Sequence, residues 1–159
     1  MKFIRSPRPD PAGRLFVFHI TRREKAALLA TLKLYPLLDP GYHQLSRHSK
    51  TAANAEQEWL EEAMAQQRQD HKKRLDQFFN NEARYFRDDK DDQRFAVSRE
   101  QMEWLLRVLN EIRVGSWVRL GRPEMEAARK VRLTTEQTRF LASMELSGYF
   151  QSVLLEAFS

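Results

Sequence analysis

Histidine, cysteine and carboxylate side chains are the residues of this sequence that could bind a metal or transfer protons. The chain has no cysteine, which excludes a disulfide framework, a thiolate zinc site and an iron–sulfur cluster. Its four histidines form no H-E-x-x-H or E-x-x-H pair that would place two ligands on one helical face. They are His19, His43, His48 and His71. We therefore expect no metal and no other cofactor.

Motifs for nucleotide and hydrolase chemistry are also missing. The sequence contains no G-x-x-x-x-G-K-[ST], no G-x-G-x-x-G and no G-x-S-x-G, and it has only five glycines. Glu58 and Glu62 are four residues apart, but they lie in a charge-rich segment where carboxylates are normally solvated. The sequence therefore predicts no catalytic residues and a role other than catalysis. An enzyme would need an acid and a base brought together from distant positions.

One apolar segment carries polar residues at helical spacing. It runs from Trp104 to Gly121, and within it Asn110, Arg113 and Trp117 fall on one face of a helix. The favoured interpretation is structural, because buried polar groups need partners: Arg113 makes a buried or semi-buried ion pair and Asn110 satisfies backbone groups. The alternative is that this face binds a ligand or a protein partner.

Positive charge is concentrated in the first third of the chain. Residues 1–51 contain ten lysines and arginines against three acidic residues, whereas the whole chain has a net charge of +5. Such a bias favours either plain solubility or the attraction of nucleic acid. The basic residues that would contact nucleic acid are Arg5, Arg8, Arg14, Arg22, Arg23 and Lys25.

Three helices can be located from their first residues. Each begins with a capping box, in which the N-cap hydroxyl and the side chain three residues later bond reciprocally to the backbone. The pairs are Thr21 with Glu24, Ser98 with Gln101, and Thr134 with Gln137. An apolar series of helical period follows each pair, so we expect helices here.

The ends of these helices are marked as well. Pro36 should stop the first helix near Tyr35, and Gly121 suits the left-handed C-cap of a helix that starts at Ser98. The third helix runs to Phe158. Its apolar face favours a place in the core, and a homodimer contact through this C-terminal helix is the alternative.

The other segments have weaker patterns. Residues 1–20 predict a β-hairpin, since two β-branched and aromatic runs flank a proline-rich loop. Residues 52–79 predict a long helix with a polar middle, which either lies over the bundle at its two ends or projects into solvent. Residues 86–97 predict a charged loop. A short helix and turn are expected between Arg122 and Arg132.

These elements indicate a mainly α fold, a helical bundle over residues 21–159 with the small N-terminal β-hairpin packed on it. The length of 159 residues fits a single domain, and the hydrophobic content of 42% with ten phenylalanines supports a real core. No apolar run approaches the roughly 18 residues that cross a bilayer. We expect no membrane contact and a cytoplasmic location.

Three blocks of the sequence are similar to a known family. They are residues 16–29, the segment Leu109-Asn110-Glu111-Ile112-Arg113 with Arg119-Leu120-Gly121, and the closing residues 140–158. The second block resembles an L-N-[DE]-x-R and R-L-G signature. On these blocks the chain resembles a bacterial family called domain of unknown function two-zero-one-seven, best known from actinobacteria. Residues 40–97 show no such similarity.

The resemblance implies a small helical cytosolic protein with no established enzymatic activity. It marks five positions as the signature: Asn110, Glu111, Arg113, Arg119 and Gly121. It also implies roles in transcriptional regulation or a link to Clp proteolysis. The leading hypothesis from the sequence is therefore a regulatory or adaptor protein that contacts an unidentified protein partner, and the alternative is nucleic-acid binding through the basic first third.

Overall fold

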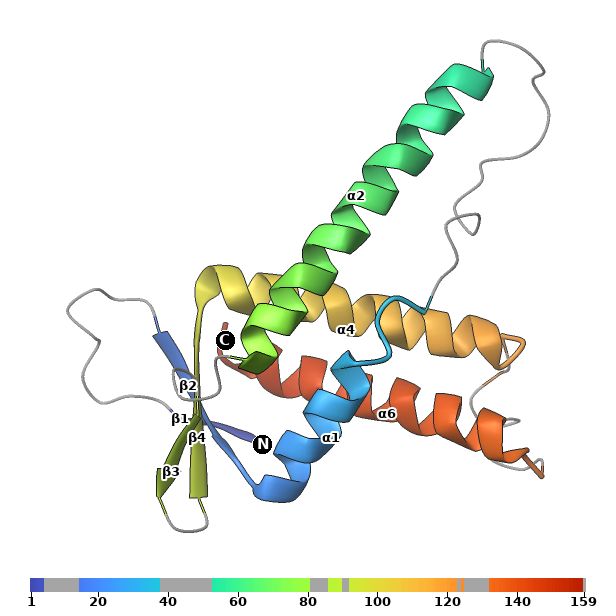
Figure 1. Cartoon of the computed structure of the whole chain (residues 1–159). Helices are drawn as coiled ribbons and strands as arrows, with labels where there is room; N and C mark the ends of the chain where they lie inside the picture. Colours follow the sequence, from blue (N-terminus) through green and yellow to red (C-terminus); the bar gives the residue numbers. More distant parts are fainter. Residues whose placement is uncertain are drawn as a thin grey trace.

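The computed structural model describes residues 1–4, 15–37, 53–80, 86–89, 92–122, 124 and 132–158. Within these ranges it contains helices α1 (Arg22–Leu32), α2 (Ala53–Asn80), α4 (Arg99–Arg119) and α6 (Thr135–Glu156) and a small antiparallel sheet (Figure 1). The predicted mainly α fold with an N-terminal hairpin is confirmed. The short helix and turn expected between Arg122 and Arg132 lie largely outside the described residues.

Local sequence explains where three of these helices begin and where α4 ends. All three predicted capping boxes are present, and in each the N-cap amide donates to the side chain three residues on at 2.9 Å. After α4, Gly121 has a φ of +83°, the left-handed conformation that favours glycine. The predicted starts of α1, α4 and α6 and the predicted end of α4 are therefore confirmed, whereas α1 ends at Leu32 and α6 at Glu156, each earlier than predicted.

The sheet has four strands in the order β1-β2-β4-β3. The predicted hairpin is β1 (Lys2–Ile4) paired with β2 (Leu15–Ile20). The prediction of a charged loop over residues 86–97 is wrong, because β3 (Phe86–Asp89) and β4 (Asp92–Ser98) form a second hairpin there. The physical reason is the partner: β4 pairs with β2 along six residues, so Gln93 and Val97 become buried while Arg94 points to solvent.

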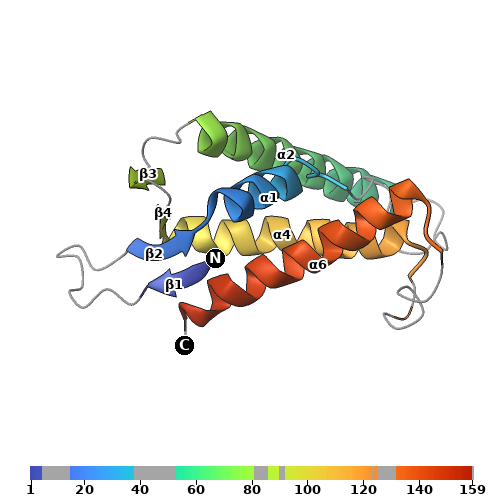
Figure 2. The same cartoon turned by 90° about the horizontal axis from the view of Figure 1, so that it is seen from below.

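Helix α4 is the centre of the core. Its Met102, Leu105, Leu109 and Ile112 are completely buried, and α6 runs antiparallel beside it along most of its length (Figures 1 and 2). The sheet covers one end of the bundle, where Phe18 and Ile20 of β2 are also fully buried. On α6 the buried residues include Phe150, Val153 and Leu154, so the prediction that this apolar face belongs to the core is confirmed.

Helix α2 is attached to the bundle at one end. Its 28 residues correspond to about 42 Å at 1.5 Å per residue. Near its C-terminal end Leu75 and Phe78 are buried, and the Phe78 ring packs on Trp104 of α4 with centroids 5.8 Å apart. The opposite half extends away from the other helices (Figure 1), and Trp59 there is 77% exposed. Of the two arrangements expected for this helix, the structure shows projection into solvent.

Among the described residues, no helix combines the length needed to cross a bilayer with sufficient apolar character.

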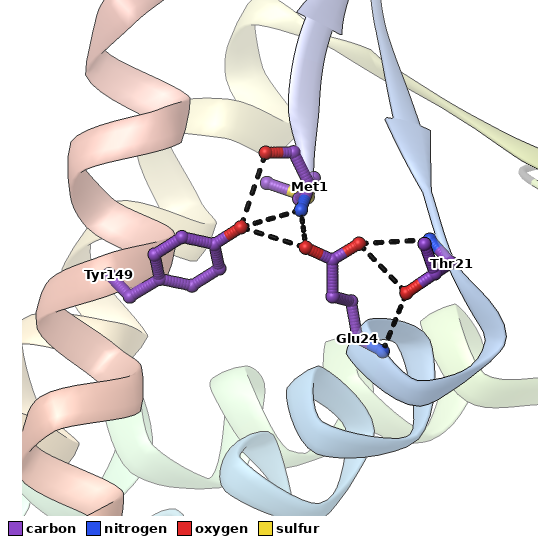
Figure 3. A network of polar contacts seen from close by, with 4 residues as sticks. All are labelled: Met1, Thr21, Glu24 and Tyr149. Atoms are coloured by element: carbon purple, nitrogen blue, oxygen red, sulfur yellow. Dashed lines mark hydrogen bonds and ion pairs between the residues drawn. The ribbon is translucent and has the colours of Figure 1, made fainter.

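A polar network fixes the first strand to helices α1 and α6 (Figure 3). The Met1 amino group forms an ion pair with Glu24 and donates to the Tyr149 hydroxyl at 2.6 Å. The Tyr149 hydroxyl in turn donates to Glu24 Oε1 at 2.8 Å, while Glu24 Oε2 completes the capping box with Thr21. Burial lowers the pKa of the Met1 amino group below its usual value. One carboxylate therefore connects a helix start, a strand and a distant helix.

Replacement of Tyr149 by phenylalanine tests this network. The ring stays, but the hydrogen bond to the Glu24 carboxylate is lost, so we expect the free energy of unfolding to fall by about 1–2 kcal/mol in urea denaturation followed by circular dichroism. Ser152→Ala is the control, because that exposed hydroxyl bonds only to its own helix at Gly148. An equal loss in both variants would contradict the proposed importance of the network.

Candidate functional site

A cleft of about 320 Å³ lies between α2 and α4, where the projecting helix leaves the bundle. Its polar lining comes from three elements: the end of the segment after α1, one side of α2 and one side of α4. The polar side chains are Tyr35, Gln67, Arg68, His71, Arg107, Asn110 and Glu111. Met64 and Val114 supply apolar walls. Its volume is at the lower end of the roughly 300–1,000 Å³ typical of small-molecule sites.

Helical periodicity explains why these residues meet. On α2, residues 64, 68 and 71 recur at intervals of four and three, so they form one stripe. On α4, residues 107, 111 and 114 form a corresponding stripe on the side opposite the buried Leu105, Leu109 and Ile112. Two stripes, each with polar residues and one apolar residue, therefore face each other across the cleft.

Tyr35 connects the two helices inside the cleft. Its hydroxyl lies 3.1 Å from Nδ1 of His71 on α2. Burial is the largest cause that raises the pKa of Tyr35, the nearby charge of Glu111 on α4 acts in the same direction, and the charge of Arg68 acts against both. The Tyr35 hydroxyl is therefore protonated near pH 7.

The contact with Tyr35 occupies one ring nitrogen of His71. Which of the two atoms donates depends on the imidazole tautomer, because Nδ1 can either give a hydrogen bond to the Tyr35 oxygen or accept one from it. In both tautomers Nε2 is the remaining polar atom of the His71 ring.

His71 is held in the neutral form. Its pKa is lowered first by burial and then by the positive charges of Arg74 and Arg107, while Asp70 acts in the opposite direction. A neutral imidazole can accept a proton or a hydrogen bond near pH 7, whereas an imidazolium cannot. The cleft therefore combines a neutral base with nearby cations.

The cations of the cleft outnumber its anions. The Nε of Arg68 lies 3.9 Å from Oε1 of Glu111. This distance is within the range of an ion pair but too long for a hydrogen bond. The Arg68 side chain is only 11% exposed, whereas Arg107 is exposed at the edge of the cleft. Among the described lining residues Glu111 is the single carboxylate, so it cannot neutralise both guanidinium groups, and these residues together carry a net positive charge.

The pKa of His71 gives a test of this arrangement. We expect His71 to titrate below 6.5, and Arg107→Gln to raise its pKa without restoring the ordinary value, because burial remains. NMR titration of the imidazole signals measures both values. Arg139→Gln on the exposed side of α6 removes the same charge elsewhere and should leave His71 unchanged.

The same shift predicts a pH dependence of stability. The folded chain binds the His71 proton less tightly than the unfolded chain, so the free energy of unfolding should fall as pH decreases through about 6.5. The decrease should end below the folded-state pKa. Urea denaturation of wild-type and His71→Gln proteins between pH 8 and pH 5, roughly the window in which His titrates, measures this contribution. Identical pH profiles for the two proteins would contradict it.

The structure divides the predicted signature between several places. Asn110 and Glu111 line the cleft. Arg113 lies on another side of α4, and its guanidinium is beside Gly148 of α6, 3.8 Å from where the Cβ of a larger residue would stand. Arg119 is exposed in the last turn of α4, and Gly121 follows the C-cap residue Leu120 in the left-handed conformation. The five positions therefore do not form one site.

The prediction of a buried or semi-buried Arg113 is wrong, since this side chain is exposed, and Asn110 is exposed as well. The buried face of α4 is centred on Leu105, Leu109 and Ile112. Asn110 is on the opposite side and Arg113 is at the edge.

The basic first third is only partly described. Arg22 and Arg23 are exposed in the first turn of α1, and Lys25 is half-buried beside them. Arg5, Arg8 and Arg14 lie outside the described residues, as do His43 and His48. Among the described residues there is no group of three or more histidine, aspartate or glutamate side chains placed to hold a metal ion.

Sequence analysis did not identify Tyr35, Arg68, His71 or Arg107 as site residues. The available signal was the spacing of Met64, Arg68 and His71 on the long polar helix, which places them on one stripe. That stripe could have been matched with Arg107 and Glu111 on α4 only if the two helices were known to be neighbours.

Comparison of the chain with protein-family models, with curated proteins and with solved structures found no match in any of the three.

Proposed function

We propose that this chain is a non-catalytic regulatory or adaptor protein that binds another protein through the outer half of α2. The observation that supports the proposal is the exposure of Trp59 and Leu60, at 77% and 41%, on the part of α2 that extends from the bundle. Large aromatic side chains are the commonest anchors of protein interfaces, and a projecting helix can place one in a partner's groove.

Charges beside the two apolar residues indicate the character of the partner. Glu58 and Glu62 are exposed next to Trp59 and Leu60, and Glu61 is half-buried. Three carboxylates around an apolar pair favour a partner with an apolar groove rimmed by lysine or arginine. The family resemblance suggests transcriptional regulation or Clp proteolysis as the process, and both remain proposals.

A photo-crosslinking experiment tests the proposed contact. The photoreactive amino acid p-benzoylphenylalanine replaces Trp59 in one variant and Trp117, which is 37% exposed on α4, in a matched control. We expect a crosslinked product of defined mass from position 59 and none from position 117, and loss of the product when Leu60→Asp is added. The identified partner, once purified, should bind Trp59→Ala about tenfold or more weakly.

Two results would count against the contact. One is the absence of a product at position 59 under conditions where the protein is folded. The other is equal affinity of the wild-type and Trp59→Ala proteins for the purified partner.

Nucleic-acid binding is a second proposal, favoured by one feature of the sheet. Lys2, His19 and Arg94 are directly opposite one another on β1, β2 and β4, so they form a row across one face. Lys2 and Arg94 are exposed and His19 is half-buried. Two exposed cations on one face of the sheet offer contacts to the phosphates of a nucleic acid.

Fluorescence anisotropy of labelled random-sequence duplex DNA at several salt concentrations tests this second proposal. Binding should weaken steeply with salt, because each neutralised phosphate releases counterions. Arg94→Ala should bind more weakly than the control Arg139→Ala. No binding at low salt would rule out the proposal and leave the protein contact.

A further inference from the structure

We propose that the cleft between α2 and α4 is a binding site for a small organic anion, a carboxylate or phosphate monoester attached to a compact apolar body. The inference goes beyond the proposed protein contact and does not depend on it, since Trp59 and Leu60 are not part of the cleft lining.

Charge is the first argument. Arg68 and Arg107 contribute two positive charges, Glu111 contributes one negative charge, and His71 is neutral. Glu111 forms an ion pair with Arg68, with Nε and Oε1 3.9 Å apart. Arg107 is exposed at the edge of the lining, with Asn110 one helical turn away on the same helix. A guanidinium with a neighbouring side-chain amide is a suitable pair of donors for a carboxylate or phosphate.

Shape and polarity give the second argument. The volume of about 320 Å³ is sufficient for a small molecule, and Met64 and Val114 offer apolar surface for its body. The Tyr35 hydroxyl occupies Nδ1 of His71, which leaves Nε2 as the ring nitrogen for a polar group of the ligand. A convergent set of a few polar groups in a partly apolar cleft is the usual composition of a ligand site.

The position of the cleft determines what binding would change. Its walls come from both α2 and α4, so a ligand that contacts the two helices binds the docked arrangement of α2 more tightly than a detached one. Occupancy should therefore shift the equilibrium of α2 toward the docked arrangement. The same ligand would hold the base of the projecting helix in place.

Benzoate and phenyl phosphate are suitable probes, and benzamide is the neutral control of nearly the same shape as benzoate. NMR titration of the full-length protein follows the imidazole signals of His71 and the side-chain amide of Asn110. We expect saturable shifts with a Kd of about 0.1–1 mM for at least one anion, and much smaller shifts with benzamide. A preference for one probe would tell whether the natural ligand is a carboxylate or a phosphate.

Two variants locate the binding. Arg107→Gln should weaken anion binding about tenfold or more, whereas Arg139→Gln, which removes one exposed arginine from α6, should leave the Kd unchanged. Val114→Phe should abolish binding by filling the cleft, with circular dichroism used to confirm that each variant is folded.

Three outcomes would overturn the proposal. They are no saturable shift with either anion up to about 10 mM, equal affinity for benzamide and benzoate, and unchanged anion affinity in Arg107→Gln. None of these outcomes bears on crosslinking at position 59, so the two proposals can fail separately.

Discussion

Replacement of Leu109 by alanine should lower the free energy of unfolding by about 2–5 kcal/mol. Leu109 lies in the middle of α4 with no exposed surface, between other fully buried residues of the same helix such as Leu105 and Ile112. Removing its methyl groups costs their transfer free energy and leaves a cavity that the packed helices can close only in part. Urea denaturation of both proteins, followed by circular dichroism at 222 nm, a wavelength of roughly maximal helix signal, measures the difference.

Leu155→Ala is the matched control. It makes the same chemical change on a helix, but Leu155 of α6 is 51% exposed, so the expected loss is within about 0.5 kcal/mol. Equal destabilisation by the two substitutions would mean that α4 is not the centre of the core.

Helix boundaries were the features most accessible to sequence analysis, because the forces that determine them are local. Thr21, Ser98 and Thr134 each bond to the backbone within their own first turn, and Gly121 needs only its own φ of +83°. No distant residue is needed for these contacts. The capping boxes therefore predicted the starts of three helices correctly.

The second hairpin was missed because its stability comes from elsewhere in the chain. Residues 86–97 are rich in charge, and a charged segment by itself has little reason to order. Strand β4, however, pairs with β2 from Leu15↔Ser98 to Ile20↔Gln93, and this neighbour buries Val97 completely. Pairing across more than seventy residues of sequence is a tertiary effect, and local propensity does not report it.

The cleft shows the same limit for function. Its central contact joins Tyr35 and His71, which are 36 residues apart, and Glu111 is a further 40 residues along the chain. The sequence identified Asn110 and Glu111 because they belong to a recognisable segment of α4. It could not indicate that the polar middle of α2 lies opposite them, since only the docking of the two helices brings the stripes together.

Phe78→Ala should have the second large effect, and it tests how that docking is maintained. Phe78 is 4% exposed and packs on Trp104, with Leu75 one turn earlier as the other buried apolar residue described near this end of α2. Loss of a buried phenylalanine costs about 3–5 kcal/mol. Because few buried contacts hold α2, we expect the cost to appear as detachment of this helix while α4 and α6 remain folded.

Hydrogen exchange by NMR distinguishes detachment from global unfolding. In Phe78→Ala the amides of residues 71–78 should lose protection, whereas those of residues 102–112 and 143–154 should keep most of theirs. Trp59→Ala is the control, since it removes a larger aromatic ring from the same helix at a site that is 77% exposed, and its exchange should match the wild type. Equal loss of protection in all helices of Phe78→Ala would show that α2 is part of one cooperative core. In that case a ligand in the cleft would stabilise the entire bundle and could not act on the projecting helix alone.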